Sequence, residues 1–224
     1  MNFLKILLTK RSFVSKIMLK ICQNNRKGQD MKTREDKRAA LIESAIELIG
    51  EHGLDKATIP AVCKNAKLNE VYVHRLFGGR TDLYNAVFDV LDREFSDFLV
   101  KASSRDFPCD EDLRKKVFRE IFDELWGFSI ENPTRSMAFI RLFYSRYFNK
   151  EHLQNRRKLY APVNRKIEEY VGGNIDGAET LNRFLDFHFC SILRALRDES
   201  EDKDYLANQT FDLIVMYARY VKNF

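Results

Sequence analysis

Residues 58–83, TIPAVCKNAKLNEVYVHRLFGGRTDL, decide the fold of this chain of 224 residues. The stretch holds two short segments with apolar residues at helical spacing, joined by a turn at Lys67 and Leu68. The pair Gly78 and Gly79 ends the second segment, because glycine tolerates the left-handed backbone found at helix ends. This order of short helix, tight turn and short helix is typical of a helix-turn-helix motif, whose second helix enters the major groove of DNA.

Capping and apolar residues predict where each helix begins and which side it buries. Thr58 is expected to cap the first short helix and Asn69 the second. Val73 and Phe77 lie four residues apart in the second helix, so we expect both to face inward. Thr81 is expected to cap a long third helix that begins immediately after the glycine pair.

The outward side of the second helix is expected to contact DNA. Glu70, Tyr72, His74 and Arg75 are left mostly on that side. Glu70 fits this role least well, because phosphate repels a carboxylate; alternatively, it accepts a hydrogen bond from a cytosine amino group. The complete predicted DNA-binding set is Thr58, Lys67, Asn69, Glu70, Val71, Tyr72, His74, Arg75 and Arg80.

This stretch resembles the tetracycline-repressor (TetR) family of bacterial regulators, by motif over about residues 33–91 and by helical layout beyond them. The matching positions are Thr58, Ile59, Ala61, Ala66, Leu68, Val73, Phe77, Arg80 and Leu83. The positions that depart from the family pattern are Lys67 for a turn glycine, Asn69 for a capping serine, Val71 for a glycine and His74 for a phosphate-contacting tyrosine. The resemblance implies that Tyr72 reads bases and that His74 and Arg80 hold phosphates. The four changes concern the operator sequence rather than the DNA-reading role.

The composition predicts an all-α fold. Hydrophobic residues make up 45% of the chain, Phe and Tyr number 18 and 9, and segments of alternating β-branched residues are absent. We expect a basic N-terminal extension (1–30), a three-helix helix-turn-helix DNA-binding domain (31–80, with the motif at 58–77) and a C-terminal helical bundle for ligand binding and dimerisation (81–224). The first helix of the DNA-binding domain is predicted over 34–52.

The net charge of +5 is concentrated at the N-terminal end. Residues 1–30 hold seven Lys or Arg against one Asp. This extension has neither an apolar run of the ~20 residues that span a bilayer nor a clear signal peptide. It is either an appendage upstream of a natural start at Met31 or a basic amphipathic arm that touches membrane or DNA. We expect a cytoplasmic protein that has no membrane partner.

Motifs for catalysis and for metal binding are missing from the sequence. The four cysteines, Cys22, Cys63, Cys109 and Cys190, have no metal-site or redox-pair spacing, so no metal or cofactor is expected. Cys63 is predicted to be a buried filler, and the alternative is a redox switch. The chain has no HExxH, nucleophile elbow, Walker loop or dinucleotide fingerprint, so we do not expect an enzyme.

Long helices are predicted beyond residue 80. They are expected at about 81–102, 110–131, 134–149, 150–171, 176–198 and 204–222, with Pro162 kinking or splitting the fourth of them. The last two are apolar on more than one face, and such a helix must be buried on every side. We expect the extra face to pack against a second copy of the chain, although packing within one chain is the alternative. The family resemblance implies a four-helix dimer interface made by these two helices.

The resemblance also implies a small-molecule effector inside the C-terminal bundle, which moves the DNA-binding domain through the helix that begins at Thr81. The richness in aromatic residues suits an apolar or aromatic effector, although such residues at helical spacing also build plain cores. Arg141 is either a buried cation that needs an anionic partner or a side chain that reaches the surface. The predicted effector contacts are Trp126, Arg141, Tyr144, Phe187 and His188, within a wider candidate set that adds Phe122, Phe139, Phe143 and Tyr147.

The sequence therefore predicts a ligand-responsive transcriptional regulator, a repressor by family default. It would bind near-palindromic operator DNA as a homodimer, with two recognition helices ~34 Å apart or a multiple of that spacing, and a small-molecule effector would release it. The alternative is an all-α dimeric interaction protein that has lost sequence-specific DNA binding. The residues that distinguish the two are Lys56, Lys64, Lys67, Arg75 and Arg80, which would line one surface in a DNA-binding protein.

Overall fold

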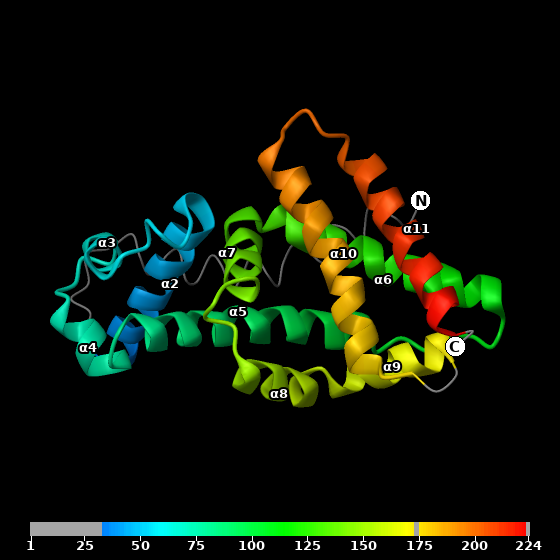
Figure 1. Cartoon of the computed structure of the whole chain (residues 1–224), viewed down its shortest axis with the longest axis horizontal. Coiled ribbons are helices and arrows are strands. Elements are labelled where there is room, and N and C mark those ends of the chain that lie inside the picture. Colours follow the sequence, from blue (N-terminus) through cyan, green and yellow to red (C-terminus); the bar gives the residue numbers. More distant parts are fainter. Residues whose placement is uncertain (1–32, 173–174, 223–224) are drawn as a thin grey trace. The chain divides into compact units, whose positions relative to one another are not determined.

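The computed structural model describes residues 33–172 and 175–222, and the predicted extension 1–30 lies outside them (Figure 1). This described part contains ten α-helices and no strand, which confirms the predicted all-α class. The chain divides into two compact units, Met1–Ala39 and Ala40–Phe224. In the first unit, Thr33 and Asp36 exchange hydrogen bonds between side chain and backbone N–H, which caps the start of helix α2 (Arg34–His52).

The helix-turn-helix motif consists of α3 (Ile59–Asn65) and α4 (Val71–Phe77), packed on α2. The bounds of α2 are those predicted from its apolar stripe. The hydroxyl of Ser44 in α2 donates to the carbonyl of Val62 in α3 at 2.8 Å, which joins the two helices inside the core. Val73 and Phe77 are buried, so the predicted inward face of α4 is confirmed.

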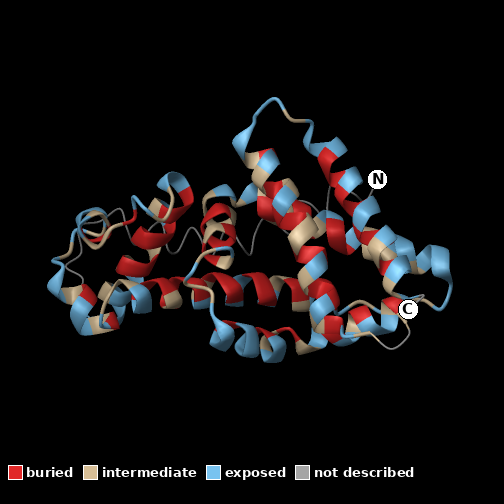
Figure 2. Ribbon diagram, viewed as in Figure 1, coloured by how far each residue is buried: buried red, intermediate tan, exposed pale blue. Residues whose placement is uncertain are grey.

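The remaining helices form a bundle. They are α5 (Arg80–Ala102), α6 (Glu111–Glu131), α7 (Pro133–Phe143), α8 (Lys150–Leu159), α9 (Ala161–Val171), α10 (Gly177–Arg197) and α11 (Lys203–Lys222). α10 packs against α9 and α11, and α5 packs against α7 (Figure 1). Buried residues follow one side of α5 and one side of α10 (Figure 2). These two sides face the core of the bundle.

Two predicted helix boundaries in the C-terminal bundle were wrong. Thr81 does not cap α5, because the helix already begins at Arg80 and Gly79 occupies the capping position. The helix predicted over 134–149 ends at Phe143, since Asn149 caps the next helix instead. The Asn149 side chain accepts hydrogen bonds from the backbone N–H groups of Glu151 and His152.

The predicted break at Pro162 is confirmed. α8 ends at Leu159, and α9 begins at Ala161 with Pro162 in its first turn, where proline loses no helical hydrogen bond. Across the described residues, none of the helices combines the length and the hydropathy that a membrane crossing requires. The same residues contain no cluster of His, Cys, Asp and Glu that could hold a metal ion.

Candidate functional site

The turn between α3 and α4 has the geometry that the sequence required of it. Lys67 adopts a φ of 55°, and among the residues described it is the one non-glycine residue with a positive φ. This conformation costs an ordinary residue about 1–2 kcal/mol, which glycine would avoid. The N–H of Leu68 donates to the carbonyl of Cys63 at 2.9 Å and closes the turn.

The two caps of the motif differ. The hydroxyl of Thr58 accepts a hydrogen bond from the N–H of Ala61, so this residue caps α3 as predicted. Asn69 is not at the capping position of α4, which Glu70 occupies without a side-chain hydrogen bond. The Asn69 side-chain oxygen nevertheless accepts from the N–H of Val71 at 2.9 Å, so it satisfies one end group of the helix from one residue farther out.

The outer face of α4 exposes a mixture of apolar, polar and charged side chains. Val71, His74 and Arg75 are all exposed, and their spacing of three and four residues places them on one side of the helix. Tyr72, the predicted base reader, is only half-buried and packs partly against the core. Glu70 is exposed immediately before this face. The other predicted DNA contacts at the turn, Lys67 and Asn69, are exposed as well.

Arg80 occupies a joint between α5 and the loop before α3. Its Nη2 donates to the carbonyl of Leu54 at 2.6 Å, and its Nε donates to the Tyr84 hydroxyl at 3.1 Å. That hydroxyl in turn donates to the carbonyl of Ala57 at 2.6 Å. Burial raises the pKa of Tyr84. Arg80 therefore has a structural role, because its hydrogen bonds connect α5 to the loop before α3. Its contact with phosphate remains a prediction.

The structure gives Arg141 a role other than the predicted one. Its Nη1 donates to the carbonyls of Ile49 and Gly50, at 2.5 and 2.9 Å, at the C-terminal end of α2. A cation there meets the negative end of the helix dipole, so Arg141 needs no buried anion. Burial, and then the charge of Arg197, lower its pKa.

The N-terminal half of α7 is tied to the same helix. The Arg135 guanidinium bonds to Glu43 of α2 and to Glu94 of α5, each at 2.6 Å. Burial lowers the pKa of Arg135, but the hydrogen bonds that it donates to Glu94 and Glu43 outweigh burial, so the net shift of the pKa is upward. A Cβ on Gly50 would lie 2.1 Å from the carbonyl oxygen of Thr134, so only glycine permits this approach of α2 to α7.

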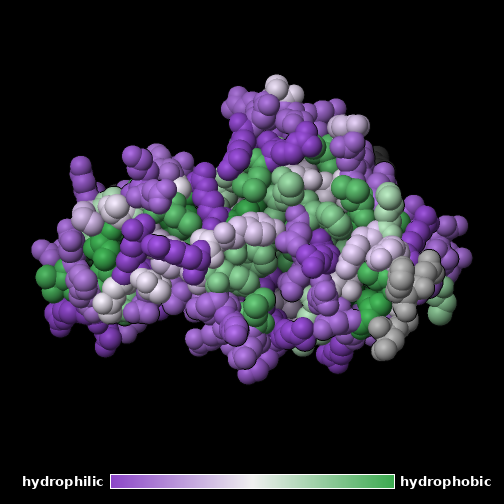
Figure 3. Space-filling model, in the orientation of Figure 1, coloured by the Kyte–Doolittle hydropathy of each residue, from purple (hydrophilic) through white to green (hydrophobic). Residues whose placement is uncertain are grey.

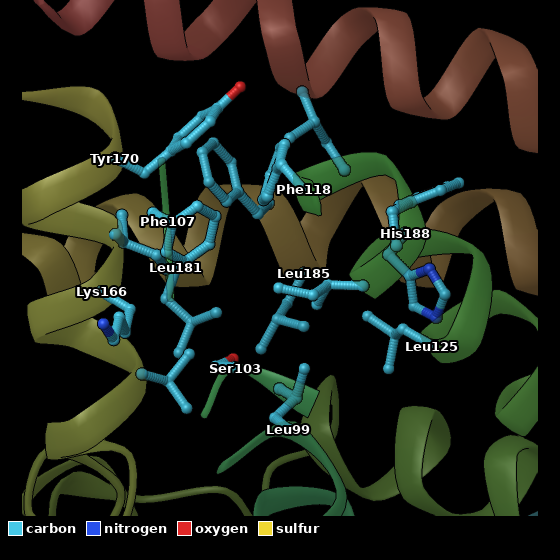
Figure 4. Close-up of a pocket in the computed structure, with 16 residues that line it drawn as sticks. Leu99, Ser103, Phe107, Phe118, Leu125, Lys166, Tyr170, Leu181, Leu185 and His188 are labelled. Atoms are coloured by element: carbon cyan, nitrogen blue, oxygen red, sulfur yellow. The ribbon is translucent and has the colours of Figure 1, made fainter. Parts of the chain in front are cut away.

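A cavity of about 60 Å³ lies within the bundle (Figure 4). Its walls come from the C-terminal end of α5 and from α6, α9, α10 and α11, and they are almost entirely apolar. Phe118 and Tyr170 stack with ring centroids 4.4 Å apart in this wall, and Phe118 also contacts Phe184 at 5.9 Å. The space therefore suits an apolar ligand with at most a few polar groups.

His188 lines this cavity and is fully buried. Its Nε2 lies 2.9 Å from the Ser129 hydroxyl, which itself donates to the carbonyl of Leu125. Because that hydroxyl has one proton to donate, the pair is consistent with a neutral imidazole that donates from Nε2. Burial lowers the pKa of His188 to about 3, so the ring carries no charge at neutral pH.

The other four predicted effector contacts do not line this cavity. Trp126 is buried next to it, with its ring 5.9 Å from that of His188. Tyr144 is exposed and donates to Asp186 at 2.7 Å, and Phe187 packs against Tyr217. The other wall residues could not be identified from the sequence, because their spacing along each helix is that of any buried helix face. The residues missed include Leu99, Phe118, Lys166, Tyr170, Leu185 and Ile214.

α11 carries an apolar stripe that is exposed in the described part of the chain. The stripe residues are between 46% and 64% exposed, and they are Tyr205, Leu213, Met216 and Tyr220. Their positions recur on one side of the helix. Hydrophobic side chains gather over α10 and α11 on the face shown in Figure 3. Large exposed apolar patches of this kind mark interaction surfaces.

The fold and these features define a class: an all-helical protein with an N-terminal helix-turn-helix motif and a ligand-sized cavity in its C-terminal bundle. Residues 41–87 match the model of the bacterial regulatory proteins of the tetR family. Over these residues the chain is therefore similar to the DNA-binding domain of tetR-family regulators. No curated protein matches it by sequence.

Solved structures share this fold at low sequence identity. A tetR-family regulator from Shewanella sp. PV-4 matches with a TM-score of 0.64 and 15% identity, over 80% of this chain and 95% of that one. SmeT, the repressor of the Stenotrophomonas maltophilia multidrug efflux pump SmeDEF, has a TM-score of 0.58 and 13% identity, over 80% and 89%. RolR in complex with resorcinol has a TM-score of 0.52 and 20% identity, over 84% and 94%.

Proposed function

We propose that this protein is a ligand-responsive repressor that binds near-palindromic operator DNA as a homodimer in the cytoplasm and is released by a small-molecule effector. The observation that carries the proposal is the exposed face of α4, which presents Val71, His74 and Arg75 beyond a well-formed turn. A recognition helix reads base edges with its N-terminal residues, while cationic side chains contact phosphates.

The charges around the motif support DNA binding over the alternative of an interaction protein. Four of the five cations that distinguish these functions are exposed, whereas Arg80 is half-buried in its joint with Leu54 and Tyr84. The exposed ones are Lys56, Lys64, Lys67 and Arg75. Exposed cations can contact phosphates wherever the DNA backbone comes within their reach, so this exposure supports DNA binding. The exposed carboxylate of Glu70 is the observation that favours the alternative.

The apolar stripe on α11 supports dimerisation. A single short recognition helix makes few base contacts, and a twofold axis doubles them on a symmetric site. The four exposed apolar side chains of the stripe would be covered by the same stripe of a second copy, because a twofold interface uses one patch on both partners. Phe187 and Tyr217, in contact across α10 and α11, would extend this interface.

The proposed route from effector to DNA runs along α5. Leu99 and Ser103 at its C-terminal end line the cavity, and Arg80 and Tyr84 at its N-terminal end hold the loop before α3. An effector shifts the equilibrium between two conformers only by its different affinity for each. A ligand in the cavity would therefore release DNA by favouring a position of α5 in which the two recognition helices no longer match one DNA site.

Two structural neighbours are consistent with this proposal. One neighbour is a repressor of an efflux pump, and another binds the small aromatic molecule resorcinol. The proposal is tested by titrating the full chain into labelled duplexes from the DNA that flanks its own gene. A shift that weakens steeply as salt rises is expected. Absence of any shift at low salt, with the dimer intact, would favour the interaction protein instead.

A further inference from the structure

Lys166 is the one ionised side chain among the described residues that line the cavity. It lies on α9, and Figure 4 places it on the opposite side of the cavity from His188. Its Nζ is 5.8 Å from the centre of the Phe107 ring, which also belongs to the wall. Lys166 therefore borders the cavity with its carbon stem, and its ammonium lies at the rim of an almost entirely apolar space.

The existing partner of Lys166 is weak. Its Nζ lies 3.2 Å from a carboxylate oxygen of Glu169, three residues along the same helix. The Glu169 side chain is 60% exposed, and ion pairs exposed to this degree contribute little because water screens them. A ligand carboxylate that reaches Lys166 from the apolar side would therefore replace this partner at small cost.

The other polar groups in the wall add no charge. His188 is neutral at neutral pH because its burial lowers the pKa, and its Nε2 is already bonded to Ser129. Burial raises the pKa of Tyr170, so its hydroxyl also stays neutral. With a single positive charge and apolar walls, the cavity disfavours a cationic ligand, whose charge would be buried without a partner.

The dimensions of the cavity restrict the ligand further. A volume of about 60 Å³ is well below the ~300–1,000 Å³ of sites for drug-sized molecules. A single ring or a short branched chain is the largest body that this space suggests. Five aromatic side chains belong to the wall, and aromatic rings favour offset or edge-to-face contacts with an aromatic ligand. They are Phe107, Phe118, Phe122, Tyr170 and Phe184.

We propose that the effector is a small amphipathic organic anion, a single-ring or short-chain carboxylate whose apolar body lies between Phe118 and Leu185 and whose carboxylate pairs with Lys166. This inference rests on the proposed function of the cavity as the effector site. The new element is the negative charge of the ligand, because neither the apolar lining nor the fold specifies that charge.

Three probes with one ring and different charges test this inference on the full chain: benzoate, benzyl alcohol and benzylamine. The chain contains a single Trp, and Trp126 lies next to His188, so its fluorescence reports binding in the cavity. We expect benzoate to bind about tenfold more tightly than benzyl alcohol, as one charge-assisted hydrogen bond provides, and benzylamine to bind most weakly. Raised salt should reduce the advantage of benzoate.

Variants at the rim separate charge from packing. Lys166→Met keeps the apolar stem and should abolish the preference for benzoate over benzyl alcohol, whereas Lys166→Arg should keep it. Glu169→Gln removes the competing carboxylate and should tighten benzoate binding by a few-fold. Lys115→Met is the matched control, because Lys115 is exposed on α6 and does not line the cavity.

Equal affinity for benzoate and benzyl alcohol, or a preference that survives Lys166→Met, would overturn the inference. These results are distinguishable from failure of the proposed function. If duplex binding is intact and benzoate has no advantage, only the assignment of ligand charge fails. If benzoate binds as expected and no duplex is bound, the cavity assignment holds and the repressor function fails.

Discussion

The helix-turn-helix motif and the bundle use the same helical backbone for opposite purposes. In α4, seven residues bury two apolar side chains and leave a face of polar and charged groups exposed. In the bundle, five helices surround a cavity with almost entirely apolar walls, and one cation, Lys166, borders it. The motif offers charge to a partner at its surface, while the bundle offers an apolar interior, which suits a polyanion in one case and a small molecule in the other.

Polar contacts join these two regions in addition to the apolar core that they share. Arg135 bridges Glu43 and Glu94, and Arg141 bonds to the last carbonyls of α2. Partly exposed ion pairs contribute little to stability, so these polar contacts can break at small cost when the two regions shift relative to each other. We expect sensitivity to ligand to depend on this joint.

Charge placed on the exposed stripe of α11 is expected to have the largest effect. Leu213→Glu combined with Met216→Glu would bury uncompensated carboxylates in the proposed interface, so the dissociation constant of the dimer should rise more than about hundredfold. Light scattering measures this, and duplex binding should fall with it. Lys203→Glu, on the same helix and outside the stripe, should leave the dimer intact. A dimer that survives both glutamates would assign the stripe to another partner.

A side chain added at Gly50, where α2 and α7 are in close contact, is expected to destabilise the packing between the two regions. The new Cβ in Gly50→Ala would overlap the carbonyl of Thr134, so we expect a loss of about 1–3 kcal/mol in the free energy of unfolding. Urea denaturation measures the change. Gly127→Ala is the matched control, because a Cβ there meets no atom within 4 Å, and alanine in a helix should stabilise by about 0.5–1 kcal/mol. Equal effects at the two positions would argue against a tight contact at Gly50.

The buried imidazole of His188 is expected to make the stability of the bundle depend on pH. Its pKa is about 3 when folded, and near 6.5 when unfolded, so the unfolded chain binds the extra proton. Stability from this group is therefore complete above pH 6.5 and is lost as the pH falls toward about 3, by at most about 1.4 kcal/mol per pH unit. Urea denaturation of His188→Gln should show a shallower decline than the parent chain. His52→Gln, at an exposed position, should follow the parent curve; a parallel decline of all three would contradict the assignment.

Removing one charge from the outer face of α4 is expected to weaken DNA binding without touching the bundle. Arg75→Ala should reduce affinity for all duplexes about tenfold and lower the salt slope by about one unit, as loss of one phosphate contact does. Duplex titration at several salt concentrations measures both quantities. The exposed Lys116 of α6 provides the control variant Lys116→Ala, which should bind DNA normally. The assignment of Arg75 fails if the two variants behave alike.

The motif could be predicted from sequence because local rules determine it. A turn residue at Lys67, a cap at Thr58 and the pair Val73 and Phe77 depend on neighbours a few residues away. The capping position of α4 was predicted at Asn69 and lies one residue later, at Glu70, because small changes of the backbone move the end of a helix by a residue.

The cavity could not be predicted in the same way. Its wall joins residues from α5 to α11, and the apolar pattern of each helix is the same whether the opposite side is packed or open. Arg141 was assigned to a ligand because a buried cation needs a partner, but carbonyls at the end of α2 supply that partner. Only the packing of separate helices shows which cation, Arg141 or Lys166, borders the empty space.

The most direct test of the central claim couples the two regions in one measurement. The full chain is titrated into a labelled operator duplex from the DNA flanking its own gene, with and without benzoate, at two salt concentrations. We predict salt-sensitive binding of a dimer that benzoate weakens and that benzylamine leaves unchanged. No binding to any such duplex at low salt, with the dimer intact, would contradict the account of this chain as a ligand-responsive DNA-binding regulator.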